Sequence, residues 1–192
     1  ALVVKNLADW WQNREPADTL EEVSHRLDTA LFAAHREIFY LGEELQHPTG
    51  STLSLLYLWG DTYLIKQIGD SRVYALEGQE IRQLTTDQTW CNQMIATGEL
   101  TPEQAHHHRL RHALVNALGV SPELEISTEQ GTVRRGMGYL LCSDGFYAEA
   151  PLYRLTTDLR TKPTRRVLEA LLENILAGSA PDNATAVLCR VV

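Results

Sequence analysis

The hydrophobic residues of this chain change their spacing near position 50, and this change limits the folds open to the chain. Up to that point the apolar side chains recur at helical intervals over about seven turns, in a stripe formed by Leu20, Val23, Leu27, Ala30, Leu31, Ala34, Ile38, Leu41 and Leu45. From Thr52 onward the period becomes two, which is typical of strands with one buried face. The pattern predicts a long amphipathic helix followed by short antiparallel strands.

Further helices are indicated on both sides of this change. The first dozen residues have apolar side chains at helical spacing. Asp18 and Glu21 form a capping-box pattern at the start of the long helix, and residues 47–50 end it. The segments 87–97 and 102–112 look helical, and residues 163–176 form an amphipathic pattern. We therefore expect helices in the first quarter, the middle and near the end of the chain.

The strands are predicted in two groups. Four short strands at 52–59, 62–68, 72–76 and 80–84 are separated by turn residues and indicate a hairpin meander. Strands return at 124–130, 139–143 and 186–192. Because long helices flank antiparallel strands, we predict an α+β fold, an antiparallel β-sandwich flanked by helices in α-β-β-α layers.

Composition narrows the class of protein. The 192 residues contain no repeat, linker or low-complexity tract, so we predict a single domain over 1–192. A net charge of -8 argues against nucleic acid as a partner. The three cysteines, Cys91, Cys142 and Cys189, are far apart, which favours buried thiols in a reducing compartment. No apolar run is long enough to span a membrane and no signal-peptide layout is visible, so we expect a cytoplasmic protein without a membrane partner.

Three acidic turns lie next to predicted strands. They are Gly69-Asp70-Ser71-Arg72, Cys142-Ser143-Asp144-Gly145 and Asp182-Asn183-Ala184-Thr185. An Asp at a strand end projects its carboxylate from a rigid element, and Mg²⁺ and Mn²⁺ prefer oxygen ligands of this kind. Two such ions can activate water against a phosphate ester. A purely local role remains an alternative for each Asp, because turns are rich in Asp and Gly.

The order of these segments resembles the metal-dependent serine/threonine protein phosphatases of type 2C, especially the bacterial branch. The resemblance is carried by residues 69–74, 84–88, 140–145 and 182–185 in sequence. It extends to Thr49-Gly50-Ser51-Thr52, which is similar to the family's Gly-Thr-Thr turn, to the flap-like run 98–105 and to Ala117-Leu118-Gly119. It covers nearly the whole chain.

The resemblance implies a metal site. Asp144 would share the metal ions, Asp182 would bind the same metal as Asp144, and Asp70 would face Asp144 across a third, weaker position. The nucleophile in the family is a water or hydroxide held by Mn²⁺ or Mg²⁺, with two or three ions in the complete site, so no side chain attacks the phosphate. Support for the metal turns is expected from Asn183, Thr185, Ser51 and Thr52.

One departure from the family pattern bears on activity. The family begins with an Asp-bearing strand and an Asp-Gly-Met-Gly-Gly-type turn that supplies the bridging ligand, and neither is present here. Ala1-Leu2-Val3-Val4 resembles the helix just after that turn. We therefore expect an N-terminally truncated phosphatase-like domain that lacks the N-terminal strands and is inactive by itself.

The resemblance implies the hydrolysis of phosphoserine and phosphothreonine in a phosphoprotein substrate, with a protein kinase as counterpart. A non-catalytic phosphatase-like domain that binds a partner or a phosphopeptide is the alternative. A structural complement to an N-terminal fragment on another chain is a third, more remote interpretation.

The histidines at 106–108, with His112, suggest a zinc site only weakly. His108 and His112 have the spacing of one helix face, yet no Glu follows His108 and no Cys lies near. A surface loop in the flap segment, or a proton donor to the leaving oxygen, are the other interpretations.

Overall fold

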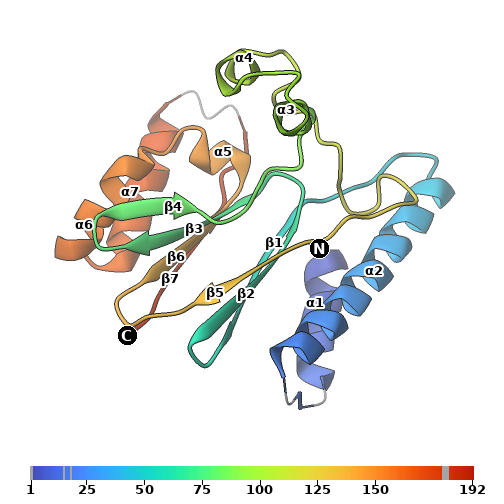
Figure 1. The fold of residues 1–192 in the computed structure, drawn as a ribbon, viewed down its shortest axis with the longest axis horizontal. Helices are drawn as coiled ribbons and strands as arrows, with labels where there is room; N and C mark the ends of the chain where they lie inside the picture. The colour runs from blue at the N-terminus through green and yellow to red at the C-terminus, as the bar shows by residue number, and fades with distance from the viewer. Residues whose placement is uncertain (1, 15, 18, 179–181) are drawn as a thin grey trace. The chain divides into compact units, whose positions relative to one another are not determined.

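The computed structural model describes the chain except for residues 1, 15, 18 and 179–181 (Figure 1). Its elements are, in order, α1 (Leu2–Asn13), α2 (Leu20–Glu44), β1 (Leu53–Trp59), β2 (Thr62–Ile68), β3 (Arg72–Glu77), β4 (Glu80–Gln83), α3 (Trp90–Ala96), α4 (Pro102–His106), β5 (Ser127–Thr132), β6 (Gly138–Cys142), α5 (Asp144–Tyr147), a 3-10 turn (Leu152–Arg154), α6 (Leu155–Thr161), α7 (Thr164–Ala177) and β7 (Ala186–Arg190). None of the helices described is both long and apolar enough to cross a bilayer.

The chain forms two compact units that alternate along the sequence. Unit 1 contains Ala1–Leu53, Lys66–Gly69 and Gln88–Thr128, and unit 2 contains Ser54–Ile65, Asp70–Asp87 and Glu129–Val192. The strands of the sheet with order β1-β2-β5 contribute residues to both units. A single domain over 1–192 remains a prediction.

In unit 1, α1 and α2 supply the helical part of an apolar core. Val3 of α1 and Leu31 and Ile38 of α2 pack in one cluster with Ile68 at the end of β2 and with Leu118. The stripe predicted for α2 is buried in its middle, but its C-terminal members Leu41 and Leu45 are exposed. Burial of the stripe therefore follows the helical period from Val23 to Ile38 and does not include its last two positions.

The start of α2 differs by one residue from the prediction. Thr19 is the N-cap, and its hydroxyl accepts a hydrogen bond from the Glu22 backbone N–H at 3.1 Å. Asp18, the predicted cap, lies outside the described residues. The cap is therefore a threonine, which uses the same chemistry one position later.

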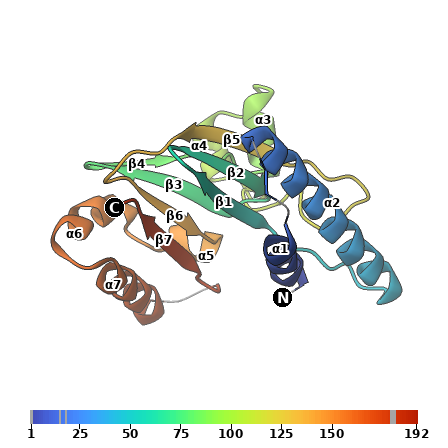
Figure 2. The same ribbon diagram turned by 90° about the horizontal axis from the view of Figure 1, so that it is seen from below.

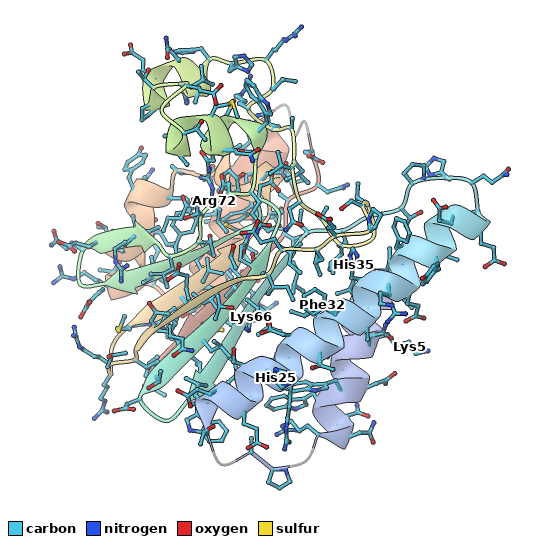
Figure 3. All side chains as sticks on the ribbon, turned by 45° about the vertical axis from the view of Figure 1, so that its right-hand side comes forward. Lys5, His25, Phe32, His35, Lys66 and Arg72 are labelled. Carbon is cyan, nitrogen blue, oxygen red and sulfur yellow. The ribbon has the colours of Figure 1, made fainter. Side chains whose placement is uncertain are left out.

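Two buried polar side chains fasten α2 within unit 1, as Figure 3 shows for Lys66 and His35. Lys66 on β2 is 1% exposed, and its Nζ lies 2.7 Å from Asp28 Oδ1 and 2.9 Å from Thr128 Oγ1. His35 Nδ1 accepts a hydrogen bond from the Gly119 N–H at 3.1 Å. Because a buried charge is tolerated only when it is paired, the Lys66 contact fixes how the helix lies on the strand.

Unit 2 contains a four-stranded antiparallel sheet with the order β4-β3-β6-β7. One face carries a core made by α5, α6 and α7, with Phe146, Leu155 and Leu171 against Leu140. Figure 2 shows α6 and α7 on the same side of this sheet. The other face packs on β2 through Tyr63 and Ile65. Unit 2 therefore has two facing sheets with helices outside one of them.

Several element predictions were wrong in detail. The predicted meander of 52–84 is divided between two sheets at the corner after Gly69, whose φ is 90°. The helix predicted over 102–112 ends at His106, and the one over 87–97 begins at Trp90. The strand predicted from 124 begins at Ser127, because Leu124 and Ile126 pack into the unit 1 core instead. Helices α5 and α6 were not predicted.

The cysteines are free thiols. Cys91 and Cys142 are buried, whereas Cys189 is only half-buried. Burial raises the pKa of the Cys142 thiol to about 12, against a smaller lowering by Arg72. The prediction of unpaired thiols is confirmed, and that of burial holds for two of the three residues.

Candidate metal centre

The register of the unit 2 sheet aligns one end of β3, β6 and β7 at the same end of the sheet. Arg72 of β3 pairs with Cys142 of β6, and Cys142 pairs with Ala186 of β7. Asp70 lies just before β3, Asp144 opens α5 just after β6, and Asp182 lies just before β7. The antiparallel pairing therefore places all three predicted carboxylates at the same end of the sheet.

The turns that contain Asp144 and Asp182 are in direct contact. The Ser143 N–H donates to Thr185 O at 3.0 Å, and the Thr185 N–H donates to Ser143 Oγ at 3.0 Å. Ser143 Oγ in turn donates to Asn183 O at 3.3 Å. Asn183 and Thr185 thus contact Ser143 through their backbones, and their support of a metal site remains a prediction. Ser143 itself was missed, although a hydroxyl residue before an Asp-Gly at a strand end is a usable signal.

Gly145 allows these two turns to approach. A Cβ at this position would lie 2.7 Å from Asn183 O and 3.1 Å from Asp182 Cβ. Both distances are shorter than ordinary contact, and one of the atoms is backbone, which cannot rotate away. Glycine is therefore required here for close approach and not for an unusual φ.

The negative charges of Asp70 and Asp144 both raise the pKa of the same tyrosine, Tyr147. Burial raises the pKa of the Tyr147 hydroxyl, the Arg72 guanidinium opposes this, and the negative charges of Asp87, Asp70 and Asp144 raise it further. Asp70 is buried, with 7% of its surface exposed, while Asp144 is half-buried and Asp182 is exposed. The Tyr147 ring therefore lies within the electrostatic reach of two predicted ligands.

Arg72 connects the segments around the site. Its Nη2 lies 2.6 Å from Asp87 Oδ2, its Nε lies 3.0 Å from Asp87 Oδ1, and its Nη1 donates to the Tyr74 hydroxyl at 3.1 Å. The guanidinium carbon stacks on Tyr147, 3.7 Å from the ring centroid. Arg72 and Asp87 were read only as parts of motifs in the sequence, because their pairing depends on the fold.

The donor set suits a hard cation in kind. Carboxylate oxygens are the ligands that Mg²⁺ and Mn²⁺ prefer, and Mg²⁺ commonly binds through one or two carboxylates and several waters. Within the part of the chain that the structure describes, no group of three or more His, Cys, Asp or Glu side chains is close enough to hold a metal ion. The adjoining Asp144 and Asp182 turns therefore fit one hydrated cation better than a bridged pair.

Ser51 and Thr52 lie in unit 1, beside the segment that leads to Asp70. Ser51 exchanges backbone hydrogen bonds with Leu118, at 3.1 and 2.9 Å, and its Oγ donates to Thr52 O at 3.0 Å. The Thr52 side chain fills the space above Gly69, where a Cβ would lie 2.4 Å from Thr52 Cγ2. Their predicted support of the metal turns remains a prediction.

The histidines of the flap-like segment face different surroundings. His108 stacks on Trp90, with ring centroids 4.8 Å apart, and its Nδ1 accepts the Leu110 N–H at 3.1 Å. This local bond competes with helix formation, and α4 ends at His106. The prediction that His108 and His112 lie on one helix face is therefore wrong. His106, His107 and His112 are exposed.

Sequence comparison identifies the family. A family model described as protein phosphatase 2C matches residues 1–189. The serine/threonine protein phosphatase PstP of Mycobacterium tuberculosis is 34% identical over 143 residues, which are 74% of this chain and 28% of that protein. The serine/threonine phosphatase stp of Listeria monocytogenes is 30% identical over 165 residues, 85% of this chain and 66% of that protein. The chain thus spans less than two thirds of these curated relatives.

Structural comparison supports the same assignment. The catalytic domain of the serine/threonine protein phosphatase PstP, solved in complex with 2 manganese ions, superposes with a TM-score of 0.79 at 31% identity. The match covers 97% of this chain and 77% of the PstP chain. The predicted fold of two sheets with flanking helices is confirmed by this likeness. The chain belongs to the protein phosphatase 2C family and is similar to its bacterial members.

Proposed function

We propose that this chain is part of the catalytic domain of a serine/threonine protein phosphatase that uses Mn²⁺ or Mg²⁺. The observation that carries the proposal is the pairing of β3, β6 and β7. Asp70, Asp144 and Asp182 adjoin the ends of these strands at the same end of the sheet. The manganese ions of the related PstP structure support this choice of cation. The substrates would be phosphoserine and phosphothreonine in cytoplasmic phosphoproteins, with a protein kinase as counterpart.

Asp144 and Asp182 would hold the cation, and Asp70 would contribute to a further, weaker position. When bound, the cation lowers the pKa of a coordinated water and neutralises charge on the phosphoryl oxygens. The chain supplies the rigid placement of its carboxylates. Ser143 ties the two turns together, and Gly145 lets them meet without a side chain between them.

Arg72 has a positioning role in this proposal. Its guanidinium is engaged by Asp87, by the Tyr74 hydroxyl and by the ring of Tyr147 at the end of α5. The phosphate-binding forks of an arginine are therefore already used. Arg72 instead fixes α5, whose first residue is Asp144, relative to the start of β3.

The 192 residues by themselves are expected to have little activity. A bridged pair of cations needs a carboxylate in addition to Asp144 and Asp182, and the described residues offer no group of three ligands. The same observation favours the second candidate function, in which the domain binds a phosphopeptide or a partner without hydrolysing it.

A metal-binding measurement combined with an assay tests both candidates. Binding of Mn²⁺ is followed by the loss of the free-ion EPR signal, and hydrolysis with p-nitrophenyl phosphate and a phosphothreonine peptide. We expect Asp144→Asn and Asp182→Asn each to weaken Mn²⁺ binding about tenfold or more, because a charged ligand is replaced by a neutral one of equal shape. Asp9→Asn removes the same charge from an exposed position of α1 and is the control.

The outcomes separate the two functions. Binding that depends on Asp144, together with manganese-dependent turnover, supports the enzyme and shows that the expected inactivity is wrong. Such binding without turnover supports the non-catalytic domain for these 192 residues. Equal Mn²⁺ binding by the Asp144→Asn, Asp9→Asn and unaltered proteins would contradict the metal site itself.

A further inference from the structure

A second candidate binding site lies at the opposite end of the unit 2 sheet. There Leu76 of β3 pairs with Gly138 of β6, and Gly138 pairs with Arg190 of β7. A cavity of about 370 Å³ opens between these strand ends, the β3–β4 turn and α6. Figure 1 shows α6 beside that turn. From Arg72 to Leu76 the strand rises about 13 Å, so this cavity is separate from the Asp144 turn.

Two hydrogen bonds from α6 and β7 frame the cavity. Thr156 of α6 is 5% exposed, and its hydroxyl donates to Gln79 O in the β3–β4 turn at 3.1 Å. Arg190 Nη1 donates to Leu159 O near the end of α6 at 3.5 Å. The helix is thereby held to the turn on one side and to β7 on the other. The cavity is thus a product of fixed contacts in the fold.

Two arginines give part of the cavity lining a positive charge. Arg160 and Arg190 both line it, and none of the described lining residues is acidic. Two of the neighbouring carboxylates have other cationic partners, since Glu77 pairs with Arg134 at 3.1 Å and Asp158 with Lys162 at 3.0 Å. In a chain of net charge -8, two arginines around one cavity are a local reversal of charge. This reversal favours an anionic ligand.

We propose that this cavity binds a phosphate monoester. The planar guanidinium group matches two phosphate oxygens at once, so a pair of arginines suits the dianion. Leu76 and Leu159 supply an apolar wall for the carbon part of the ligand. The volume falls near the lower end of the range of about 300–1,000 Å³ for small-molecule sites. The ester is carried by a small metabolite or by a phosphorylated protein side chain.

The proposal goes beyond phosphatase activity and needs no metal, so it is tested in EDTA. Amide NMR shifts of Gly78 and Gly136 report locally, because both glycines line the cavity and open space lies beside them. The probes are adenosine monophosphate and a phosphoserine peptide, with adenosine and the unphosphorylated peptide as their controls. We expect saturable shifts with a phosphorylated probe only.

Arginine variants connect the shifts to the cavity. Arg160→Gln and Arg190→Gln together should weaken binding about tenfold or more, because charge-assisted hydrogen bonds to the phosphate are lost. Arg165→Gln removes the same charge from α7, where the side chain is 89% exposed and pairs with Glu169, and should leave the affinity unchanged. The spectra of the variants also show whether each protein is folded.

Each outcome decides the proposal. Shifts with adenosine monophosphate assign the site to small metabolites, and shifts with the phosphopeptide alone assign it to a protein ligand. The proposal is overturned if neither phosphorylated probe shifts these glycines at about 10 mM, a limit for even weak specific binding. Equal shifts with adenosine, or equal affinity in the double Arg160→Gln/Arg190→Gln variant, would overturn it as well.

Discussion

Removing the Arg72 charge should destabilise unit 2 strongly. Removing the charge of its partner Asp87 as well should restore part of that stability. Breaking a buried ion pair on one side costs about 3–5 kcal/mol, because the remaining charge stays desolvated. The Arg72 side chain is 26% exposed and that of Asp87 is 9% exposed, so solvent screens part of the effect. We therefore expect Arg72→Met to lower the free energy of unfolding by about 2–3 kcal/mol. Asp87→Leu should act in the same direction.

The double variant Arg72→Met/Asp87→Leu distinguishes pairing from packing. With both charges absent neither group is left buried alone, so the loss should be smaller than the sum of the two single losses by about 1–3 kcal/mol. Thermal unfolding followed by circular dichroism is a suitable assay. For a chain of this size, 1 kcal/mol corresponds to about 2–4 °C in Tm, so the single variant should melt about 4–12 °C lower.

Arg165→Met is the matched control, since Arg165 pairs with Glu169 on the exposed face of α7. We expect no measurable change in Tm for this variant. A double variant whose loss equals the sum of the single losses would falsify the reasoning. In that case Arg72 would contribute through its contacts with Tyr74 and Tyr147 alone.

Three further predictions use other contacts. Gly145→Ala should weaken Mn²⁺ binding about tenfold, measured by EPR, because the new methyl group pushes the two acidic turns apart; unchanged affinity would show that their contact is dispensable. Lys66→Met should lower Tm by several degrees, because its buried ion pair on α2 loses one partner, whereas Lys5→Met on exposed α1 surface should not; equal effects would contradict this. Iodoacetamide at pH 8 should label Cys189 before Cys142, detected by mass spectrometry, because the pKa of the Cys142 thiol is raised to about 12 and only the thiolate reacts; the reverse order would be incompatible with that burial.

The sequence predicted individual elements better than their partners. The turns at Gly60-Asp61 and at Gly69-Asp70 enclose β2, whose observed bounds agree with the prediction. The same pattern does not say which sheet a strand joins, because a buried face looks alike in both. Consecutive strands β2 and β3 therefore separated unexpectedly at Asp70. Helix α5 spans a single turn and is too short to show a helical period.

The candidate site was likewise predicted from the sequence only in part. The placement of the three aspartates beside strand ends could be predicted, because each motif adjoins a strand-like run, whereas their role as metal ligands remains a prediction. Arg72 and Tyr147 were not recognised, because their contact depends on antiparallel register and on which face of α5 meets β3. No periodicity in the sequence encodes such contacts. They become visible only when β3, β6 and β7 are aligned.

Because β6 is paired on both sides, it keeps its two ends at a fixed separation and in a fixed register. Every residue from Gly138 to Cys142 has a partner on β3 and another on β7. One end of this strand borders the arginine-lined cavity and the other leads into the Asp144 turn. A slip of one residue would turn every β6 side chain to the opposite face, so the strand cannot adjust one end alone. Substitutions within β6 should consequently disturb the cavity and the acidic turns together.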